Sequence, residues 1–412
     1  MRRCGQAADA SIVVRVELRL VVVFVLVALL LTACQSSSRG EPAAAPSPIT
    51  EGAGCPAGAT RLTPGDGALF GLNLDWAHDT PAAASERLGR DPAVYVLFVS
   101  YPPIPEEWTG IEAAASTLIT KGAALLLTLE PMGGLSTVTA ENASALADRL
   151  ASYNGRGLPV YLRFGHEMNG SWYPWSQQPQ QYVAAFRLLA DAVHRAAPLT
   201  ATVWAPNYGG GYPFAGGRHG ALPGSSGFAA LDTNHDGRLS IEDDPYAPYY
   251  PGDDAVDWVG MSLYHWGNTY PWGENELPEA GKFVAQLRGI YSGAGGDDTA
   301  LPDFYGVFAE GHGKPLSITE TAAFYAPGEP GAAPAEIKEA WWTQVFAAVD
   351  ALPGIRMVNW FEWSKFEGEV NHEVDWTVSR EPGMAGRFAA SLPGRFLSAP
   401  LQTVCTRKAS KT

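Results

Sequence analysis

Eight short apolar runs recur along the chain, and this repetition is the feature that most restricts its fold. Each run is continuously apolar, as in parallel strands covered on both faces, and most are followed by a helical stretch. Strands that alternate with helices form a closed barrel or an open doubly wound sheet. Eight runs without a glycine-rich dinucleotide motif favour an α/β fold of the (β/α)8 TIM barrel type. The runs are Leu69–Trp76, Val94–Tyr101, Ala123–Glu130, Val160–Glu167, Ala201–Asn207, Val256–His265, Pro315–Thr321 and Ile355–Trp363.

The predicted barrel occupies residues 55–405, because about 350 residues suit one large α/β domain better than two small ones. Two connecting stretches, Gln180–His194 and Glu336–Val349, place apolar residues on one helical face. Residues 208–254 depart most from the alternation, since they are rich in glycine, proline and acids. We expect this insertion to form an elaborate loop beside the carboxyl ends of the strands, where the reactive groups of such barrels lie.

The N-terminus has the pattern of an export signal. Arginines precede the apolar run Val21–Leu31, which is too short to span a bilayer comfortably. The string LTAC that ends at Cys34 resembles the bacterial lipobox, in which the cysteine receives lipid. Residues 1–33 are therefore predicted to be a lipoprotein signal peptide, and the Ser, Pro, Ala and Gly rich residues 34–54 a flexible linker. The alternative is an ordinary signal peptide with an incidental cysteine.

These features predict an exported lipoprotein of the cell membrane that faces the extracellular side or the periplasm. Cys55 and Cys405 then remain at the two ends of the folded part, where they either form a disulfide or stay as two free thiols. Residues 406–412 are predicted to be a C-terminal tail. We expect membrane contact through the lipid anchor only, and a monomer.

The charge of the chain restricts its partners. The formal net charge is -15, and nucleic acid is an unsuitable partner because phosphate contacts need clustered lysine and arginine. The chain also contains 13 tryptophans, more than a core alone explains, since tryptophan is seldom fully buried. Exposed aromatic platforms and a neutral or cationic substrate are therefore expected.

Two glutamates close predicted strands on opposite sides of the barrel. Glu167 ends the fourth run and Glu320 ends the seventh. Cleavage of a glycosidic bond needs one carboxylic acid to protonate the leaving oxygen, and a second carboxylate to attack the anomeric carbon or activate water. The alternative is a structural role, in which these strand-end acids make salt bridges or cap helices, since position on a fold alone does not establish chemistry.

The residues around Glu167 carry a family resemblance. The string RFGHEMNG at residues 163–170, followed by WYPW at residues 172–175, resembles the acid/base motif of glycoside hydrolase family 26. This family is best known for β-mannanases and belongs to the retaining clan A of β/α-barrel glycosidases. The resemblance implies that Glu167 is the acid/base and Glu320 the nucleophile of a double displacement. It also implies β-1,4-mannan as the first substrate to consider.

The same resemblance implies roles for three neighbours. His166 would orient the catalytic groups, Tyr264 would bond the nucleophile, and Trp360 would form a sugar platform. We group these three residues as substrate-binding candidates.

Other residues near strand ends are candidates from the sequence itself. Trp172 is expected to stack on sugar, with plain packing as the alternative. Asn207 and Glu130 close predicted strands and are expected to bind sugar hydroxyls or to orient their neighbours. Arg163 precedes Glu167 by four residues, which favours a side chain that points into the barrel and holds a carboxylate.

Residues 232–243, inside the insertion, have the pattern of a calcium loop. Oxygen-bearing side chains alternate at the start, a glycine follows at the sixth position, and an acid stands at the twelfth. The last acid is aspartate in place of glutamate, as in dockerin-like loops, and no clear amphipathic helix precedes it. We predict a structural Ca²⁺ here and no cofactor for catalysis; the alternative is a solvated acidic turn. The predicted ligands are Asp232, Asn234, Asp236, Arg238 through its carbonyl, and Asp243.

Together these patterns predict a retaining endo-β-glycanase that acts on a β-linked plant-type polysaccharide. A β-1,4-xylanase or a mixed-linkage β-glucanase of the same fold is a sister possibility, because the motif reports the bond-breaking residues more than the sugar. From another class, a lipoprotein could bind polysaccharide without cutting it. Both glutamates argue against that reading, since a pure binder has no need of them.

Overall fold

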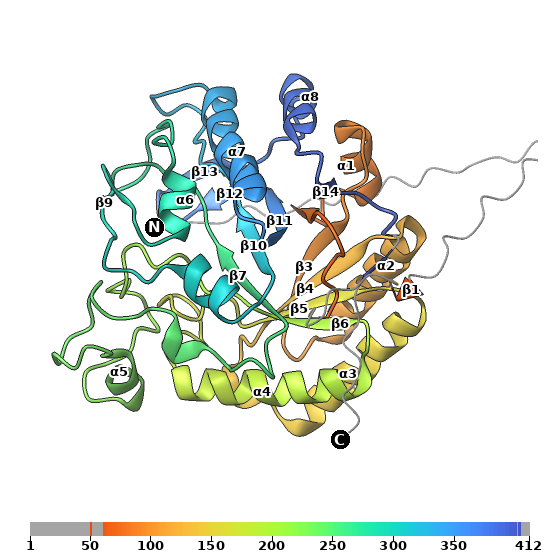
Figure 1. Ribbon diagram of the computed structural model, residues 1–412, viewed down its shortest axis with the longest axis horizontal. Helices are drawn as coiled ribbons and strands as arrows, with labels where there is room; N and C mark the ends of the chain where they lie inside the picture. Colours follow the sequence, from red (N-terminus) through yellow and green to blue (C-terminus); the bar gives the residue numbers. More distant parts are fainter. Residues whose placement is uncertain (1–49, 52–60, 402, 405–412) are drawn as a thin grey trace, which may run out of the picture. The chain divides into compact units, whose positions relative to one another are not determined.

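The computed structural model describes residues 50–51, 61–401 and 403–404. The predicted signal peptide, Cys34, most of the linker, Cys55 and Cys405 lie outside the described residues. Within them, eight parallel strands form a closed ring, because the last strand pairs with the first. Figure 1 shows helices arranged around this ring. The predicted (β/α)8 barrel is confirmed.

The barrel strands match the eight apolar runs in order. Neighbouring strands pair in parallel around the ring, and the short strand β14 (Phe396–Leu397) adds outside the ring, next to the first barrel strand. The barrel strands are β2 (Ala68–Leu74), β3 (Val94–Ser100), β4 (Ala124–Glu130), β5 (Val160–Phe164), β6 (Thr200–Trp204), β7 (Trp258–Ser262), β10 (Leu316–Thr321) and β11 (Ile355–Glu362).

Short strands lie outside the barrel. One hairpin follows the last barrel strand, another follows α6 (Lys282–Leu287), and a short parallel pair joins the first and the last of the described residues. They are β12 (Ser364–Glu367) with β13 (His372–Asp375), β8 (Ser292–Gly293) with β9 (Gly296–Asp297), and β1 (Thr50–Glu51) with β15 (Thr403–Val404).

Proline and glycine mark the ends of the helices. Five helices in the described residues begin with proline, whose missing N–H would have had no partner in the first turn. Gly89 and Gly122 end the first two helices in the left-handed conformation. The helices that begin with proline are α1 (Pro81–Leu88), α2 (Pro105–Lys121), α4 (Pro179–Ala196), α7 (Pro334–Ala351) and α8 (Pro382–Ser391).

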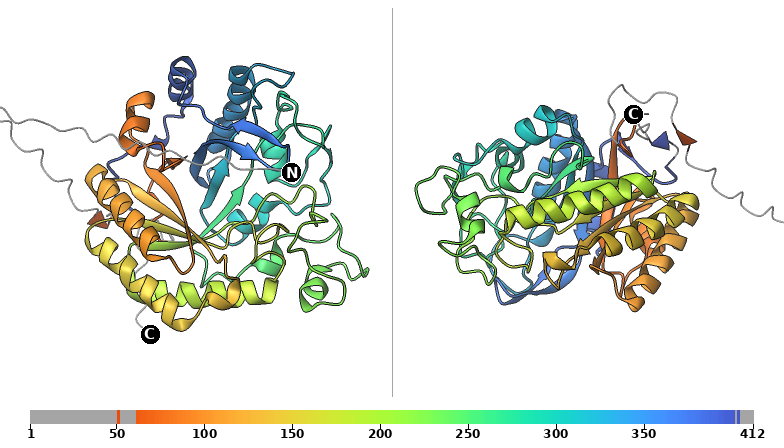
Figure 2. Two further views of the ribbon diagram at one scale, coloured as in Figure 1. Left: turned by 180° about the vertical axis from the view of Figure 1, so that it is seen from behind. Right: turned by 90° about the horizontal axis from the view of Figure 1, so that it is seen from below.

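The remaining helical segments complete the connections. The 3-10 turns are η1 (Leu135–Thr137) and η2 (Ala247–Tyr249), and Tyr305–Gly311 (η3) is a short π-helix. The two remaining α-helices are α3 (Ala140–Gly155) and α5 (Ser226–Leu231). The views in Figure 2 show α3 and α4 side by side along one flank of the barrel. Both predicted amphipathic stretches are helical, within α4 and α7. No helix of the described residues combines the length and apolar character needed to cross a membrane.

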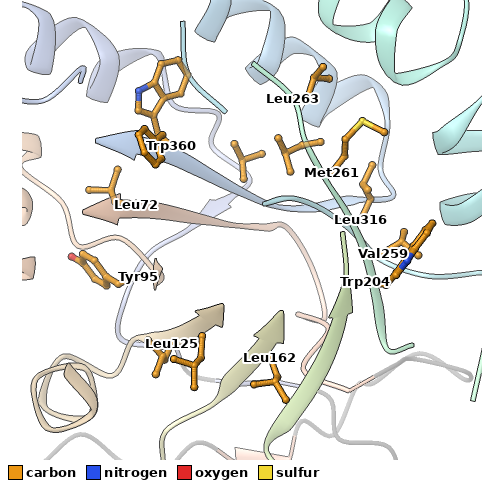
Figure 3. Packing of buried hydrophobic residues seen from close by; sticks show 14 of the residues in the cluster. Leu72, Tyr95, Leu125, Leu162, Trp204, Val259, Met261, Leu263, Leu316 and Trp360 are labelled. Atoms are coloured by element: carbon orange, nitrogen blue, oxygen red, sulfur yellow. The ribbon is translucent and has the colours of Figure 1, made fainter. Parts of the chain in front are cut away.

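The hydrophobic core has two layers because successive strand side chains alternate between the two faces of the sheet. The larger layer lies between the strands and the surrounding helices. Figure 3 shows its side chains, among them Leu72, Leu125 and Trp360, pointing away from the centre of the ring. The smaller layer fills the inside of the barrel with residues such as Tyr161 and Trp258. The inside of the barrel is therefore filled by side chains, as in other barrels of this type.

Polar side chains replace this apolar filling towards the carboxyl ends of the strands. They are buried, and on three strands an apolar residue of the inner layer lies two positions earlier: Leu126 before Thr128, Tyr161 before Arg163, and Met357 before Asn359. Gly71 helps to make room for them, since a Cβ at this position would lie 2.1 Å from Asn359 Oδ1. This polar layer consists of Asn73, Thr128, Arg163, Ser262, Ser317, Thr319 and Asn359.

Candidate active site

Glu320 lies at the end of β10 and is held by two groups, one on β5 across the ring and one just after the adjacent strand β7. The guanidinium Nη1 of Arg163, on β5, donates to Glu320 Oε1. The hydroxyl of Tyr264 donates to Glu320 Oε2 over 2.7 Å. Arg163 also donates through Nη2 to Ser262 Oγ at 2.7 Å, which keeps its planar group in one orientation. Glu320 is 6% exposed and Arg163 fully buried, so these are charge-assisted bonds in a site with little water.

The prediction that Arg163 points into the barrel and holds a carboxylate is thus confirmed. The predicted contact between Tyr264 and Glu320 is also present. Burial, and after it the negative charge of Glu320, raises the pKa of the Tyr264 phenol well above its ordinary value, so it stays an O–H donor. Ser262 was not predicted. It ends β7, two residues before Tyr264, and only the register of β7 against β10 shows that it lies opposite Glu320.

Glu167 follows β5 in an unusual backbone conformation. The strand ends at Phe164 rather than at Glu167 as predicted, because Gly165 and Glu167 have φ angles of 52° and 53°. A left-handed conformation is uncommon for a residue with a side chain and is typical of functional sites that the surrounding structure holds in place. Here the Glu167 N–H donates to the Ala205 carbonyl at 3.0 Å, which anchors the turn to the chain after β6.

The carboxyl of Glu167 has a different environment from that of Glu320. The Nε1 of Trp172 donates to Glu167 Oε2 at 3.1 Å. Burial, and after it the charge of Glu320, raises the pKa of Glu167 to about 7. Glu167 can therefore keep a proton near neutral pH, while Arg163 and Tyr264 stabilise negative charge on Glu320.

The WYPW segment divides its aromatic residues between surface and support. Trp172 is 38% exposed beside Glu167, as a sugar-contacting ring would be. Trp175 is fully buried, stacks on Tyr173 at 4.4 Å between ring centroids, and donates from Nε1 to the His166 carbonyl at 2.7 Å. Trp175 is therefore a packing residue that supports the turn of Glu167.

His166 lies beneath this turn. It is 2% exposed, and its Nε2 lies 3.2 Å from the Tyr173 hydroxyl. Burial, with a smaller effect from Arg163, lowers the pKa of His166 well below its ordinary value, so the ring is neutral. These contacts match an orienting role and leave little surface for direct contact with sugar.

Asn207 and Glu130 both lie at the rim of the barrel, in different settings. The Asn207 backbone exchanges two hydrogen bonds of 2.8 Å with the side chain of Asn169, a residue of the HEMNG motif for which the sequence predicted no role. Glu130, at the end of β4, is partly buried. Burial, and after it the charge of Glu320, raises its pKa to about 7. The carboxyl of Glu130 therefore lies close enough to Glu320 for the charge of Glu320 to raise its pKa.

The prediction that Trp360 forms a sugar platform is wrong. Its side chain is fully buried and points outward from β11, where its ring packs 5.3 Å from that of Phe388 on α8. Its Nε1 donates to the Trp376 carbonyl at 3.1 Å. The alternation of side chains along β11 places Phe361, at 8% exposure, on the opposite face.

The calcium-like loop folds around its own carboxylates. Asp232 accepts the N–H groups of Asp236 and Gly237, both at 3.0 Å. Asp243 is 1% exposed and accepts from Thr233 at 2.8 Å and Ser240 at 2.9 Å, so it ties the two ends of the loop together. The described residues contain no cluster of three or more His, Cys, Asp or Glu side chains arranged for a metal. An ion here would need the Asn234 amide and the Arg238 carbonyl as well.

The insertion at residues 208–254 also packs against the turn of Glu167. The Trp172 and Phe214 rings lie 5.1 Å apart, and Ser171 Oγ donates to the Phe214 carbonyl at 2.6 Å. The insertion contains only α5 and η2 as regular elements. Its placement beside the site agrees with the expectation from the sequence.

Comparison with known proteins gives one family match. Residues 126–214 match the model of Glycosyl hydrolase family 26, a segment that includes β5, Glu167 and Asn207. Endoglucanase H of Acetivibrio thermocellus is 28% identical over 287 residues, which cover 67% of this chain and 25% of that protein. The chain thus spans about a quarter of the length of the curated relative it matches.

Two solved structures are also similar. An endo-beta-1,4-mannanase double mutant of Cellulomonas fimi has a TM-score of 0.49 at 17% identity, covering 81% of this chain and 72% of that one. The catalytic domain of an endo-beta-1,4-mannanase from Bacillus sp. JAMB-750 has a TM-score of 0.46 at 17% identity, covering 82% and 91%. At these scores and identities neither likeness bears on the substrate.

The raised pKa of Glu167 predicts that Glu167→Gln stabilises the protein in a pH-dependent way. A carboxyl whose pKa is higher in the folded protein than in the unfolded chain favours folding below its unfolded pKa. That contribution is lost as the pH rises through about 7. Glutamine cannot ionise, so we expect Glu167→Gln to melt above the wild type at about pH 8 and near it at about pH 4.

Differential scanning calorimetry at both pH values makes this comparison. Glu106→Gln, at an exposed position of α2, serves as the control. If the melting temperatures of Glu167→Gln and the wild type differed equally at both pH values, the raised pKa of Glu167 would be contradicted.

Proposed function

We propose that the chain is a member of glycoside hydrolase family 26, whose model matches residues 126–214, and that it is a retaining endo-β-glycanase that hydrolyses a β-linked polysaccharide. The observation that carries the proposal is the contrast between Glu167 and Glu320. One carboxyl keeps a proton near neutral pH and the other is held by an arginine and a tyrosine. Retaining glycosidases need two neighbouring carboxyl groups in these two states.

In the first step, Glu320 attacks the anomeric carbon while Glu167 gives its proton to the departing glycosidic oxygen. The bond between the anomeric carbon and that oxygen breaks as the bond to the Glu320 carboxylate forms. Arg163 and Tyr264 keep the attacking carboxylate in one orientation, which reduces the entropy lost on reaching the transition state. Trp172 donates to Glu167 and holds the acid in place.

In the second step, Glu167 acts as a base. Once Glu320 is esterified to the sugar, its negative charge no longer raises the pKa of Glu167, which favours the ionised form. Glu167 then takes a proton from water as the water oxygen attacks the anomeric carbon and Glu320 leaves. The sugar is released with the configuration it had in the polymer.

For the substrate we propose β-1,4-mannan, from the resemblance of the motif around Glu167. A β-glucan is the second candidate, favoured by the name of the curated relative, Endoglucanase H. Hydrolysis of xylan requires the same double displacement, so xylan is tested in the same assay. Glu130, Asn207 and Trp172 lie at the rim and are our candidates for contacts with sugar.

The non-catalytic binding lipoprotein is a poorer explanation of the site. A binding protein has no use for a buried arginine that holds one carboxylate beside a second carboxyl of raised pKa. Burying such charges costs free energy that binding alone does not recover.

We further propose that residues 232–243 bind a structural Ca²⁺. His235 and Gly237 have φ angles of 62° and 83°, and in this turn side-chain oxygens of Asp232 and Asn234 both accept the N–H of Asp236, so the two oxygens lie close together. Calcium takes such oxygen ligands in flexible geometry. An ion would strengthen the insertion that packs against Trp172.

Substitution of either glutamate is expected to abolish catalysis. Glu167→Gln removes the transferable proton and Glu320→Gln the nucleophile, so each should lower reducing-sugar release by at least about a thousandfold. The assay compares mannan, mixed-linkage β-glucan and xylan, with Glu106→Gln as a matched control. NMR of the first product should show a retained anomer. An inverted anomer, or cleavage by either variant at the wild-type rate, would contradict the mechanism.

Removal of calcium is expected to destabilise the protein. Chelation should lower the melting temperature, and added Ca²⁺ should restore it, because an ion that binds only the folded state stabilises that state. Asp232→Ala should remove this response while Asp191→Ala, at an exposed position of α4, retains it. A melting temperature indifferent to chelator in the wild type would rule out the ion.

We also propose that the protein is exported and anchored through lipid on Cys34. Cys34→Ala should then appear in the soluble fraction after cell lysis, whereas Cys4→Ala should remain with the membranes. Metabolic labelling with a fatty acid gives an independent measurement. Continued membrane association of Cys34→Ala without label would overturn the anchor.

A further inference from the structure

A series of aromatic rings leads outward from the nucleophile. The Tyr264 ring lies 5.3 Å from that of Trp376, and Trp376 lies 4.8 Å from Trp266. Trp266 lies 5.8 Å from Trp272, and Trp272 lies 5.1 Å from Tyr270. We call these five residues the aromatic ladder. Its inner end is the residue that bonds Glu320, so the ladder is continuous with the candidate active site.

Exposure rises along the ladder from Trp376 outward, while Tyr264 at the inner end is partly buried. Trp376 is 1% exposed, Trp266 is partly buried, Trp272 is 38% exposed and Tyr270 is 75% exposed. The inner rings are therefore core residues that support the outer two. Singly exposed apolar residues are common on protein surfaces, but two neighbouring aromatic rings that continue a buried series form a patch, and such patches often mark binding sites.

The segment that carries the outer rings is well braced. It connects β7 to α6, and the Glu276 carboxylate accepts the N–H groups of Asn268 at 2.5 Å and Thr269 at 3.2 Å. Lys282 Nζ donates to the Gly267 carbonyl at 2.6 Å. These bonds hold the backbone before Tyr270, and after it the Asn275 N–H donates to the Pro330 carbonyl at 3.1 Å. The exposure of Tyr270 therefore does not result from a segment lacking internal contacts. A braced platform loses little conformational entropy when a ligand binds.

We infer that Trp272 and Tyr270 form a distal sugar-binding platform for the polymer that is cut between Glu167 and Glu320. The inference rests on the proposed function and extends it to sugar units beyond the cleaved bond. Aromatic rings present flat apolar faces on which the C–H faces of a pyranose can pack, and ligand sites combine such faces with a few polar groups.

The negative charge near the platform restricts the kind of polysaccharide that it can bind. Glu274, Glu276 and Glu279 follow Trp272 closely in the chain, and Lys282 is 5% exposed, with its ammonium group bonded to the loop. An acidic polysaccharide would meet repulsion here. The platform therefore suits a neutral polymer of hexose or pentose units and disfavours polyuronic acids.

The test compares long and short substrates. Trp272→Ala should lower kcat/KM about tenfold on the polymer that the wild type cleaves, mainly through KM, since about 1.4 kcal/mol of lost binding is tenfold. On an aryl glycoside of the matching disaccharide, which does not reach the platform, kcat/KM should stay within about twofold. Trp272→Phe should retain most of the polymer activity. Ile290→Ala, another exposed apolar position at 64%, is the control for both substrates.

Several outcomes would overturn the platform. Equal losses on both substrates would mean that Trp272 acts only by supporting the site. No loss on either substrate would mean that polymer does not contact it. A change of oligomeric state in Trp272→Ala, measured by sedimentation, would make the patch an interface between copies of this chain.

A failure of the proposed function gives a different result. If the wild type releases sugar from no polymer, affinity electrophoresis in gels containing mannan, mixed-linkage β-glucan or xylan still tests the platform. Retardation of the wild type that Trp272→Ala loses would support it without catalysis. A wild type that no polymer retards, or a variant retarded equally, would overturn it.

Discussion

The buried pair of Arg163 and Glu320 is the interaction on which the rest of the site depends. An arginine with no exposed surface must have its charge compensated, and Glu320 supplies that compensation from the opposite side of the ring. A buried guanidinium also needs acceptors for its N–H groups, and Ser262 Oγ accepts a hydrogen bond from Arg163 Nη2. Replacing such a pair with apolar residues often leaves a protein as stable or more so, which points to chemistry as the reason for its presence.

The charge on Glu320 also influences the other carboxyl groups. Burial contributes most to the raised pKa values of Glu167 and Glu130, and the charge of Glu320 contributes next. The left-handed turn at Glu167 presents one of these groups beside Trp172, while Tyr264 keeps the nucleophile in place. Two glutamates of identical chemistry therefore have different protonation behaviour because the fold places them in different surroundings.

Aromatic residues have three separate tasks in this structure. Trp175 and Trp360 are buried and fill space, Trp172 is exposed and bonds the acid, and the outer rings of the ladder extend the surface away from Glu320. Residue type does not distinguish these tasks. Exposure does, and exposure depends on which face of a strand or loop a ring occupies.

The sequence by itself determined the barrel, the order of its strands, and the positions of Glu167, Glu320 and Arg163 near strand ends, because apolar periodicity and local motifs are properties of neighbouring residues. It failed at Trp360, where a difference of one residue in strand phase exchanges the inner and outer faces. It also missed Ser262, Asn169 and the aromatic ladder. Their partners are distant in the chain, and only the closing of the ring and the packing of the connecting loops bring them together.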